Sequence, residues 1–238
     1  MSPIIKAECH NCTNSNCLIK KHYTSEEAVP FIEKKHTIHC KKSQQFILEG
    51  APVYGLYFIF RGIVKVSQSS TAERNQIIRF STDGEIVGHR GFGTDYVYNV
   101  SASALEDTVL CNFSSEDFNE MLMTNPKLMY DFMLFYADQL QKSETNSKRF
   151  SQMTVREKVI SAILLIKRKF GQSDGYLALT LSRKDIAEFA GTTEEQVIKV
   201  ISMLKKEHLI KAKGKKLGIE DEDLLEAQIP PHKHILAS

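Results

Sequence analysis

The sequence SRKDIAEFAGTTEEQVIKVISMLKK, residues 182–206, contains two helix starts separated by a short turn. Ser182 lies three residues before Asp185, and Thr193 lies three residues before Gln196. This spacing lets each hydroxyl cap a helix while the later side chain reaches back, which is the pattern of a capping box. Apolar residues recur at helical spacing after each start. The stretch therefore predicts a helix-turn-helix built on a shared core.

The second predicted helix is the part of such a motif that can enter the major groove of DNA. Its leading side chains would belong to Glu194, Glu195, Ile198 and Lys199. We expect further contacts to DNA from three residues around the motif: Ser182, Thr193 and Lys213. An ordinary corner of two packed helices would show the same pattern, so this stretch alone leaves both interpretations open.

The composition is that of a globular protein, with 42% hydrophobic and 25% charged residues among 238. The net charge of +2 does not by itself indicate a nucleic-acid partner. Six lysines lie within residues 205–216, however, ahead of four acidic residues at 220–223. These lysines could bind phosphates, although such a run is also typical of a solvated surface.

Membrane, secreted and enzymatic functions find little support in the sequence. No apolar run approaches the roughly 20 residues of a membrane span, and the N-terminus lacks the regions of a signal peptide. We therefore expect a cytoplasmic protein with no membrane partner. We find no phosphate-binding glycine loop, nucleophile elbow or paired catalytic carboxylates, so we expect no enzymatic activity.

Residues 36–113 consist of short apolar runs broken by glycines and polar turns, which is typical of a small antiparallel roll or barrel. The run LYFIFRGIVKV, residues 56–66, is apolar on both faces, so we expect both faces to be buried from solvent. We assign residues 25–124 to this β-roll sensor domain. Residues 1–24 precede it as a cysteine-containing segment with little helical or strand pattern.

A long helix is predicted for residues 125–151, because Pro126 suits a first helical turn and apolar residues follow at coiled-coil spacing. The predicted dimer seam consists of Met129, Met133, Tyr136, Leu140 and Phe150. Packing on the chain's own core is the alternative, but the length of the helix favours a homodimer. Residues 152–228, with a hairpin turning at 213–215, would form a winged helix-turn-helix, followed by a tail at 229–238.

Three of the five cysteines, Cys9, Cys12 and Cys17, lie within nine residues of one another. In a reducing compartment such clustering indicates metal or redox chemistry. Together with His22 they have the spacing of a zinc site with three cysteines and one histidine. Cys111 lies in an apolar strand and by itself could be an ordinary core residue.

A glycine-punctuated β-roll, a long helix and a C-terminal winged helix-turn-helix, in this order, resemble the Crp/Fnr family of bacterial transcription regulators. The resemblance is carried by residues 56–66, by GEIVG at 84–88, by NPKLMYDFMLFYADQL at 125–140 and by residues 181–215. It implies an α+β fold with a cyclic-nucleotide-binding-like β-roll, a dimerisation helix and a winged helix-turn-helix. The implied partners are palindromic double-stranded DNA, a second copy of the chain and RNA polymerase.

The resemblance also assigns roles in the second helix of the motif. Glu195 matches a familial glutamate that accepts from a cytosine amino group, and Lys199 stands where an arginine reads guanine. Lysine lacks the planar guanidinium with which arginine donates two parallel hydrogen bonds. We therefore expect a different half-site sequence or a weaker sequence preference. Ile198 could contact a thymine methyl group.

The cyclic-AMP-binding branch of the family holds the cyclic phosphate with an Arg-Ser pair after the GEIVG-like turn. This chain has His89-Arg90-Gly91 there and YNVS at residues 98–101, so the pair is absent. A buried phosphate without positioned donors is costly, and we do not expect cyclic AMP to bind.

The oxygen-sensing Fnr branch has three N-terminal cysteines and a fourth in the roll, which Cys9, Cys12, Cys17 and Cys111 match. The match implies a [4Fe–4S] cluster sensitive to oxygen or nitric oxide. The second gap is four residues here and five in the best-known member, which leaves the metal open. Cys40 stands alone and is not an expected ligand. The alternatives are structural zinc, a small-molecule signal, an interaction module without DNA, or haem bound by His36, His39 or His89.

Overall fold

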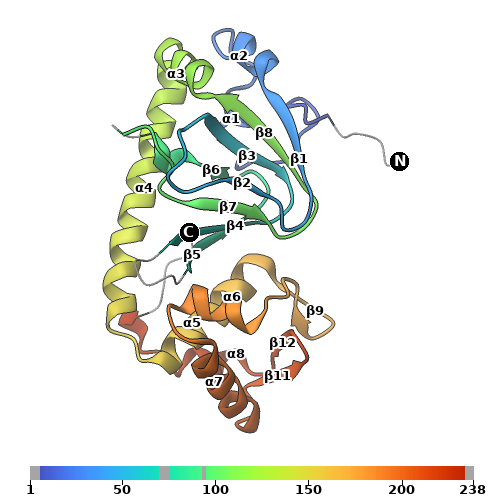
Figure 1. Cartoon of the computed structure of the whole chain (residues 1–238), viewed down its shortest axis with the longest axis vertical. Coiled ribbons are helices and arrows are strands. Elements are labelled where there is room, and N and C mark those ends of the chain that lie inside the picture. The colour runs from blue at the N-terminus through green and yellow to red at the C-terminus, as the bar shows by residue number, and fades with distance from the viewer. Residues whose placement is uncertain (1–5, 70–74, 93–94, 234–238) are drawn as a thin grey trace. The chain divides into compact units, whose positions relative to one another are not determined.

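The computed structural model describes three ranges of residues: 6–69, 75–92 and 95–233. The chain divides into two compact units, Met1–Tyr136 and Ala137–Ser238. The first contains an antiparallel roll and the second contains helices with two short hairpins (Figure 1). The beginning of the predicted N-terminal segment, 1–5, and the end of the predicted tail, 234–238, lie outside the described residues.

The roll consists of two four-stranded sheets in which all paired strands are antiparallel, as predicted. The first sheet has, in spatial order, β1 (His36–Cys40), β8 (Thr108–Ser114), β3 (Gly55–Arg61) and β6 (Ile86–Val87). The second has β2 (Gln45–Ile47), β7 (Ser101–Ala104), β4 (Val64–Ser69) and β5 (Asn75–Ser81).

Strand β3 is buried on both faces, as its continuous apolar sequence predicts. Tyr57 and Ile59 belong to the core that the two sheets share, together with Val66 of β4. Leu56 and Phe58 face the other way and belong to a second core, formed between the first sheet and the helices of this unit. The outer face of the first sheet is therefore covered, and Cys9, Cys17 and Cys111 belong to this second core.

The helices of the first unit are α1 (Leu18–His22), α2 (Val29–Lys34), α3 (Ser115–Thr124) and the beginning of α4 (Pro126–Ser151). A short turn, η1 (His89–Gly91), follows β6. Helix α1 corrects the expectation of little regular structure in residues 1–24. A five-residue helix has little stability by itself, and this one is held by burial of Ile19, which is 2% exposed.

The second unit contains α5 (Val155–Phe170), α6 (Arg183–Ala190), α7 (Glu194–Lys206) and α8 (Glu222–Glu226), with a last turn η2 (Pro231–Lys233). Its two hairpins pair β9 (Gln172–Ser173) with β10 (Tyr176–Leu177) and β11 (Ile210–Lys213) with β12 (Lys216–Ile219). The predicted winged helix-turn-helix is thus present. None of the described helices is both long and apolar enough to cross a membrane.

Candidate functional site

Four cysteines from two distant parts of the chain line one small cavity of about 20 Å³. Cys111 comes from β8, where it faces the covered outer side of the first sheet. Cys9, Cys12 and Cys17 come from the N-terminal segment that covers this side. The structure thus brings together the four predicted ligands. Cys40 does not join them, because it is buried in the core between the two sheets.

The N-terminal segment is fastened to the roll by hydrogen bonds as well as by apolar contacts. The Ala7 N–H donates to Thr37 Oγ1 at 3.2 Å, and Asn14 Nδ2 donates to the Phe60 carbonyl at 2.9 Å. Ala7 is fully buried and Cys17 is 9% exposed. Cys9 and Cys12 are half-buried, and the apolar surface on which the segment packs comes from β3 and β8.

A glycine in the turn between β5 and β6 lets this turn approach the cysteine segment. Gly84 has a φ of +81°, which favours glycine. A Cβ atom built on it would lie 3.3 Å from both Asn14 Cβ and the Cys17 nitrogen. The backbone of the cysteine segment therefore packs directly against this turn.

Burial favours the protonated form of three thiols of the site, those of Cys9, Cys17 and Cys111. Burial raises the pKa of Cys17 to about 11 and that of Cys111 to about 12. Burial also raises the pKa of Cys9, while the nearby Lys35 lowers the pKa values of Cys9 and Cys111. Metal ligation requires thiolates, so binding at this site would release protons and gain affinity as pH rises.

The four thiols are the donor type that both zinc and an iron–sulfur cluster use. Among the described residues, no three His, Cys, Asp or Glu side chains converge closely enough to hold a single ion. Zinc needs its four ligand atoms within about 2.0–2.3 Å of one point. A four-iron cluster gives each thiolate its own iron, so its ligand sulfurs lie farther apart. Four cysteine thiolates are a donor set of both groups, and the N-terminal segment would have to move outward to admit either, because the cavity holds little more than a water.

The histidines considered as ligands lie elsewhere. His22 does not line the cysteine cavity, and its Nε2 lies 2.9 Å from Asp131 Oδ2 of α4. His36 and His39 are exposed on β1, and His89 lines a different pocket of about 10 Å³, far too small for haem. Neither the zinc set with His22 nor a haem site is assembled by these side chains.

The first predicted capping box is present and the second is only half formed. Ser182 Oγ accepts from the Asp185 N–H at 3.0 Å, and the Ser182 N–H donates to Asp185 Oδ2 at 3.2 Å. Thr193 Oγ1 accepts from the Gln196 N–H at 3.3 Å. The Gln196 side chain, however, accepts from the Thr192 hydroxyl instead of reaching back. The predicted start of α7 is therefore right, whereas the predicted hydrogen bond from the Gln196 side chain back to the Thr193 backbone is wrong.

Helix α7 has a buried and an exposed face. The buried face consists of Val197, Val200, Ile201 and Leu204. The exposed residues include all four that we expect to lie in the major groove: Glu194, Glu195, Ile198 and Lys199. Ile198 is 51% exposed and leaves an apolar contact surface among charges.

The hairpin β11–β12 carries exposed lysines beside α6. Lys213 is exposed at the end of β11, where we predict a contact to DNA. Arg183, in the first turn of α6, donates from its guanidinium to the Gly214 carbonyl at 3.0 Å and so holds the hairpin tip. Sequence reasoning missed this role, because no local pattern connects a helix start to a turn 31 residues later.

The predicted seam on α4 separates into two environments. Met129, Met133 and Leu140 are exposed, and Met133 is 55% exposed. Tyr136 instead packs on the roll, where its hydroxyl donates to the His89 carbonyl. Phe150 is half-buried, and Lys158 Nζ lies 5.1 Å from its ring centroid. Tyr136 is therefore partly buried against its own chain, while Met129, Met133 and Leu140 remain exposed and available to a partner.

Both units are similar to known protein domains. Residues 37–125 match the family model of the cyclic nucleotide-binding domain, and residues 157–228 match that of the Crp-like helix-turn-helix domain. The two matches follow the order of the roll and the winged helix-turn-helix described above. The chain belongs to the Crp/Fnr family.

Curated Crp/Fnr relatives align over most of their length. The fumarate nitrate reduction regulatory protein of Klebsiella oxytoca is 26% identical over 223 residues, covering 91% of this chain and 88% of the relative. The transcriptional activator protein anr of Pseudomonas aeruginosa is 26% identical over 220 residues, with 91% and 90% covered. These relatives support a transcription regulator of the Crp/Fnr type.

Solved Crp/Fnr structures share the fold. FixK2 from Bradyrhizobium japonicum superposes with a TM-score of 0.72 at 20% identity, covering 82% of this chain and 98% of FixK2. A transcriptional regulator of the CRP/FNR family from Thermus thermophilus gives 0.68 at 19% identity, with 81% and 97% covered. At such identities the likeness supports the fold alone.

Proposed function

We propose that this Crp/Fnr regulator is a homodimer that binds palindromic DNA under the control of a [4Fe–4S] cluster held by Cys9, Cys12, Cys17 and Cys111. The observation that carries the proposal is the shared cavity: four thiols from the N-terminal segment and β8 line it. The cluster, when bound, supplies reactivity toward oxygen or nitric oxide. The protein supplies the thiolates and the path from them to α4.

The path begins at Cys17, which directly precedes α1. Helix α1 ends at His22, whose Nε2 contacts Asp131 Oδ2 of α4 at 2.9 Å. A movement of the cysteine segment would therefore act on the helix that carries Met129 and Met133. A single side-chain contact contributes little free energy, so it shifts the monomer–dimer equilibrium only modestly. The signal therefore has an effect only if the dimer is marginally stable.

The output of the proposed switch is the spacing of two α7 helices on DNA. A symmetric dimer places them about 34 Å apart, so each enters the major groove of one half-site. Glu195 and Lys199, both exposed, would then read bases, and Lys213 would contact a phosphate. RNA polymerase is the expected partner of the DNA-bound dimer.

Anaerobic reconstitution with iron and sulfide tests the proposal. Wild-type protein should bind about four iron atoms per chain and show visible thiolate-to-iron absorption. Cys111→Ser should lose both, whereas the control Cys40→Ser should retain both because Cys40 is outside the cavity. A folded wild-type protein that binds no iron, or one zinc ion per chain instead, would exclude the cluster.

DNA binding is tested separately with the same samples. A fluorescent palindromic library should be bound more tightly by the loaded protein than by the protein after exposure to air. If binding is equally tight with and without iron, DNA recognition stands and its control by a cluster does not.

A further inference from the structure

One lysine lies beside the four cysteines without a partner of its own. Lys35 lines the cysteine cavity and is half-buried. Among the described residues, its ammonium group has no hydrogen-bond or ion-pair partner. Charged groups that are withdrawn from water usually have a partner of opposite charge. The position of Lys35 therefore indicates that a negative charge forms beside it.

Strand pairing places Lys35 on the same face of the first sheet as Cys111. Thr37 of β1 lies directly opposite Cys111 of β8, so the two side chains point to one face. Lys35 precedes Thr37 by two residues in extended backbone, and the alternation of side chains brings it to this face as well. The Thr37 hydroxyl accepts from the Ala7 N–H at 3.2 Å, so the cysteine segment packs on this same face.

The pKa values of two thiols are consistent with this placement. Burial raises the pKa of Cys9 and of Cys111, and Lys35 is the strongest of the influences that lower them. One ammonium group thus acts both on a thiol of the N-terminal segment and on the thiol of β8. Its charge favours the thiolate forms that metal ligation requires.

Two other charged residues line the cavity, and each has its own partner. Lys20 Nζ donates to the Cys9 carbonyl at 2.5 Å and so fastens the cysteine segment to the helix that follows it. The Glu8 carboxylate lies 3.5 Å from Lys6 Nζ. Among the charged residues described around this cavity, Lys35 is therefore the one whose charge the protein does not itself use.

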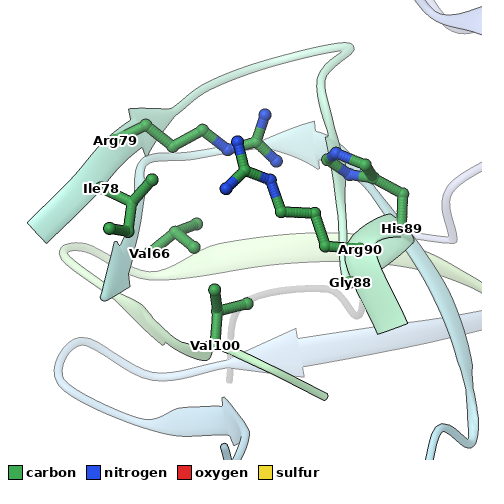
Figure 2. Close-up of a pocket in the computed structure, with 7 residues that line it drawn as sticks. All are labelled: Val66, Ile78, Arg79, Gly88, His89, Arg90 and Val100. Atoms are coloured by element: carbon green, nitrogen blue, oxygen red, sulfur yellow. The ribbon is translucent and has the colours of Figure 1, made fainter. Parts of the chain in front are cut away.

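The buried arginines of the roll do not supply charge to the cysteines. Arg79 and Arg90 line a separate pocket with His89, and this pocket shares no lining residue with the cysteine cavity. Figure 2 shows the two guanidinium groups close together in that pocket. The positive charge at the cysteine cavity therefore comes from its own lining.

We propose that Lys35 supplies the positive charge that a metal bound by the four cysteine thiolates requires. Four thiolates carry more negative charge than one zinc ion or an oxidised four-iron cluster offsets, so either bound group keeps a net negative charge. A nearby ammonium group lowers the cost of holding this charge in a half-buried place. Lys35 is not a ligand and acts through the thiolates. The inference rests on the proposed function only in that the cysteines bind a metal, and it applies to both metal classes.

Cobalt(II) is the probe, because thiolate ligation makes it absorb visible light and because its binding needs neither iron nor sulfide. Metal-free full-length protein is titrated anaerobically with cobalt(II) against a colourless chelator of known affinity. Lys35→Gln should raise the dissociation constant about tenfold. Lys35→Arg should stay within about twofold of wild-type protein, because the charge remains.

Lys34→Gln is the matched control. Lys34 is the neighbouring residue, but it is exposed, does not line the cavity and pairs with Asp117 at 2.9 Å. Its loss should leave the cobalt dissociation constant unchanged. Far-ultraviolet circular dichroism and urea unfolding at the pH of the titration establish that each variant is folded before affinities are compared.

The outcomes separate the role of Lys35 from the proposed function. Equal dissociation constants in wild-type protein and Lys35→Gln would overturn this role and leave the metal site in place. A loss in Lys35→Arg as large as in Lys35→Gln would do the same, because it would show that charge is not what counts. Cobalt binding that depends on Lys35, in a protein that takes up no iron, would support the role and exclude the cluster. Wild-type protein that binds neither metal would overturn both.

Discussion

His22 Nε2 lies 2.9 Å from Asp131 Oδ2, and this contact joins the helix that follows Cys17 to the helix that carries the predicted dimer seam. The His22 side chain is only 13% exposed, so the contact is shielded from solvent on one side. It is a direct polar connection from the cysteine segment to α4.

Asp131→Asn tests whether this contact transmits a signal. We expect iron content to remain unchanged, while the difference in dimer dissociation constant between loaded and metal-free protein shrinks about two- to fivefold, the equivalent of about 0.5–1 kcal/mol. Analytical ultracentrifugation of both forms measures it. Asp138→Asn is the matched control, because Asp138 pairs with Lys142 on the same helix at 3.0 Å. Identical behaviour of the two variants would mean that the His22 contact carries no signal.

The stability of the metal-free protein should fall at alkaline pH because of the buried thiols. The pKa of an unfolded cysteine is 9.0, and the folded values are about 11 for Cys17 and about 12 for Cys111. Above pH 9 the unfolded chain loses these protons first, so the free energy of unfolding decreases from pH 9 toward pH 11–12 and is constant below. We expect the free energy of unfolding, measured with urea, to decrease between pH 8 and pH 10. The decrease should be about 1 kcal/mol smaller in Cys17→Ser than in wild-type protein. An identical decrease in the two proteins would show that the Cys17 thiol is exposed to solvent in the folded protein.

Gly84→Ala should loosen the cysteine segment. Alanine at a φ of +81° is strained, and its Cβ would lie 3.3 Å from Asn14 and Cys17. Gly50→Ala is the matched control, because Gly50 has a φ of +83° with nothing within 4 Å. We expect a loss of about 1 kcal/mol in Gly50→Ala and about 1 kcal/mol more in Gly84→Ala, measured by urea unfolding. Equal losses would show that the segment does not pack on this turn.

Glu195→Ala should relax sequence preference at one position of the half-site more than it lowers affinity for nonspecific DNA. A carboxylate that accepts from cytosine discriminates by about 1–3 kcal/mol, whereas nonspecific binding depends on lysines. Selection from a randomised half-site library measures the preference. Lys205→Ala, in the last turn of α7, is the control and should leave the preference unchanged. An unaltered preference in Glu195→Ala would contradict the docking of α7 in the groove.

The helix-turn-helix was predictable almost to the residue, because its boundaries depend on local chemistry. Ser182 and Thr193 cap the helices that begin directly after them, and Gly191, with a φ of +58°, ends the first. The roll was predictable as a class from the apolar faces of β3. The half-formed box at Thr193 was not, because the Gln196 side chain had a competing neighbour in Thr192.

The sequence by itself thus determined the order of the parts, the capped helices of the winged motif and the four cysteines as a candidate set. Only the tertiary structure decided that the cysteine segment packs on β3 and β8, that Tyr136 turns toward His89, and that Arg79, His89 and Arg90 line one pocket inside the roll. Caps and strand patterns depend on residues a few positions apart. These other features depend on contacts between side chains that are tens of residues apart, and local spacing carries no information about such contacts.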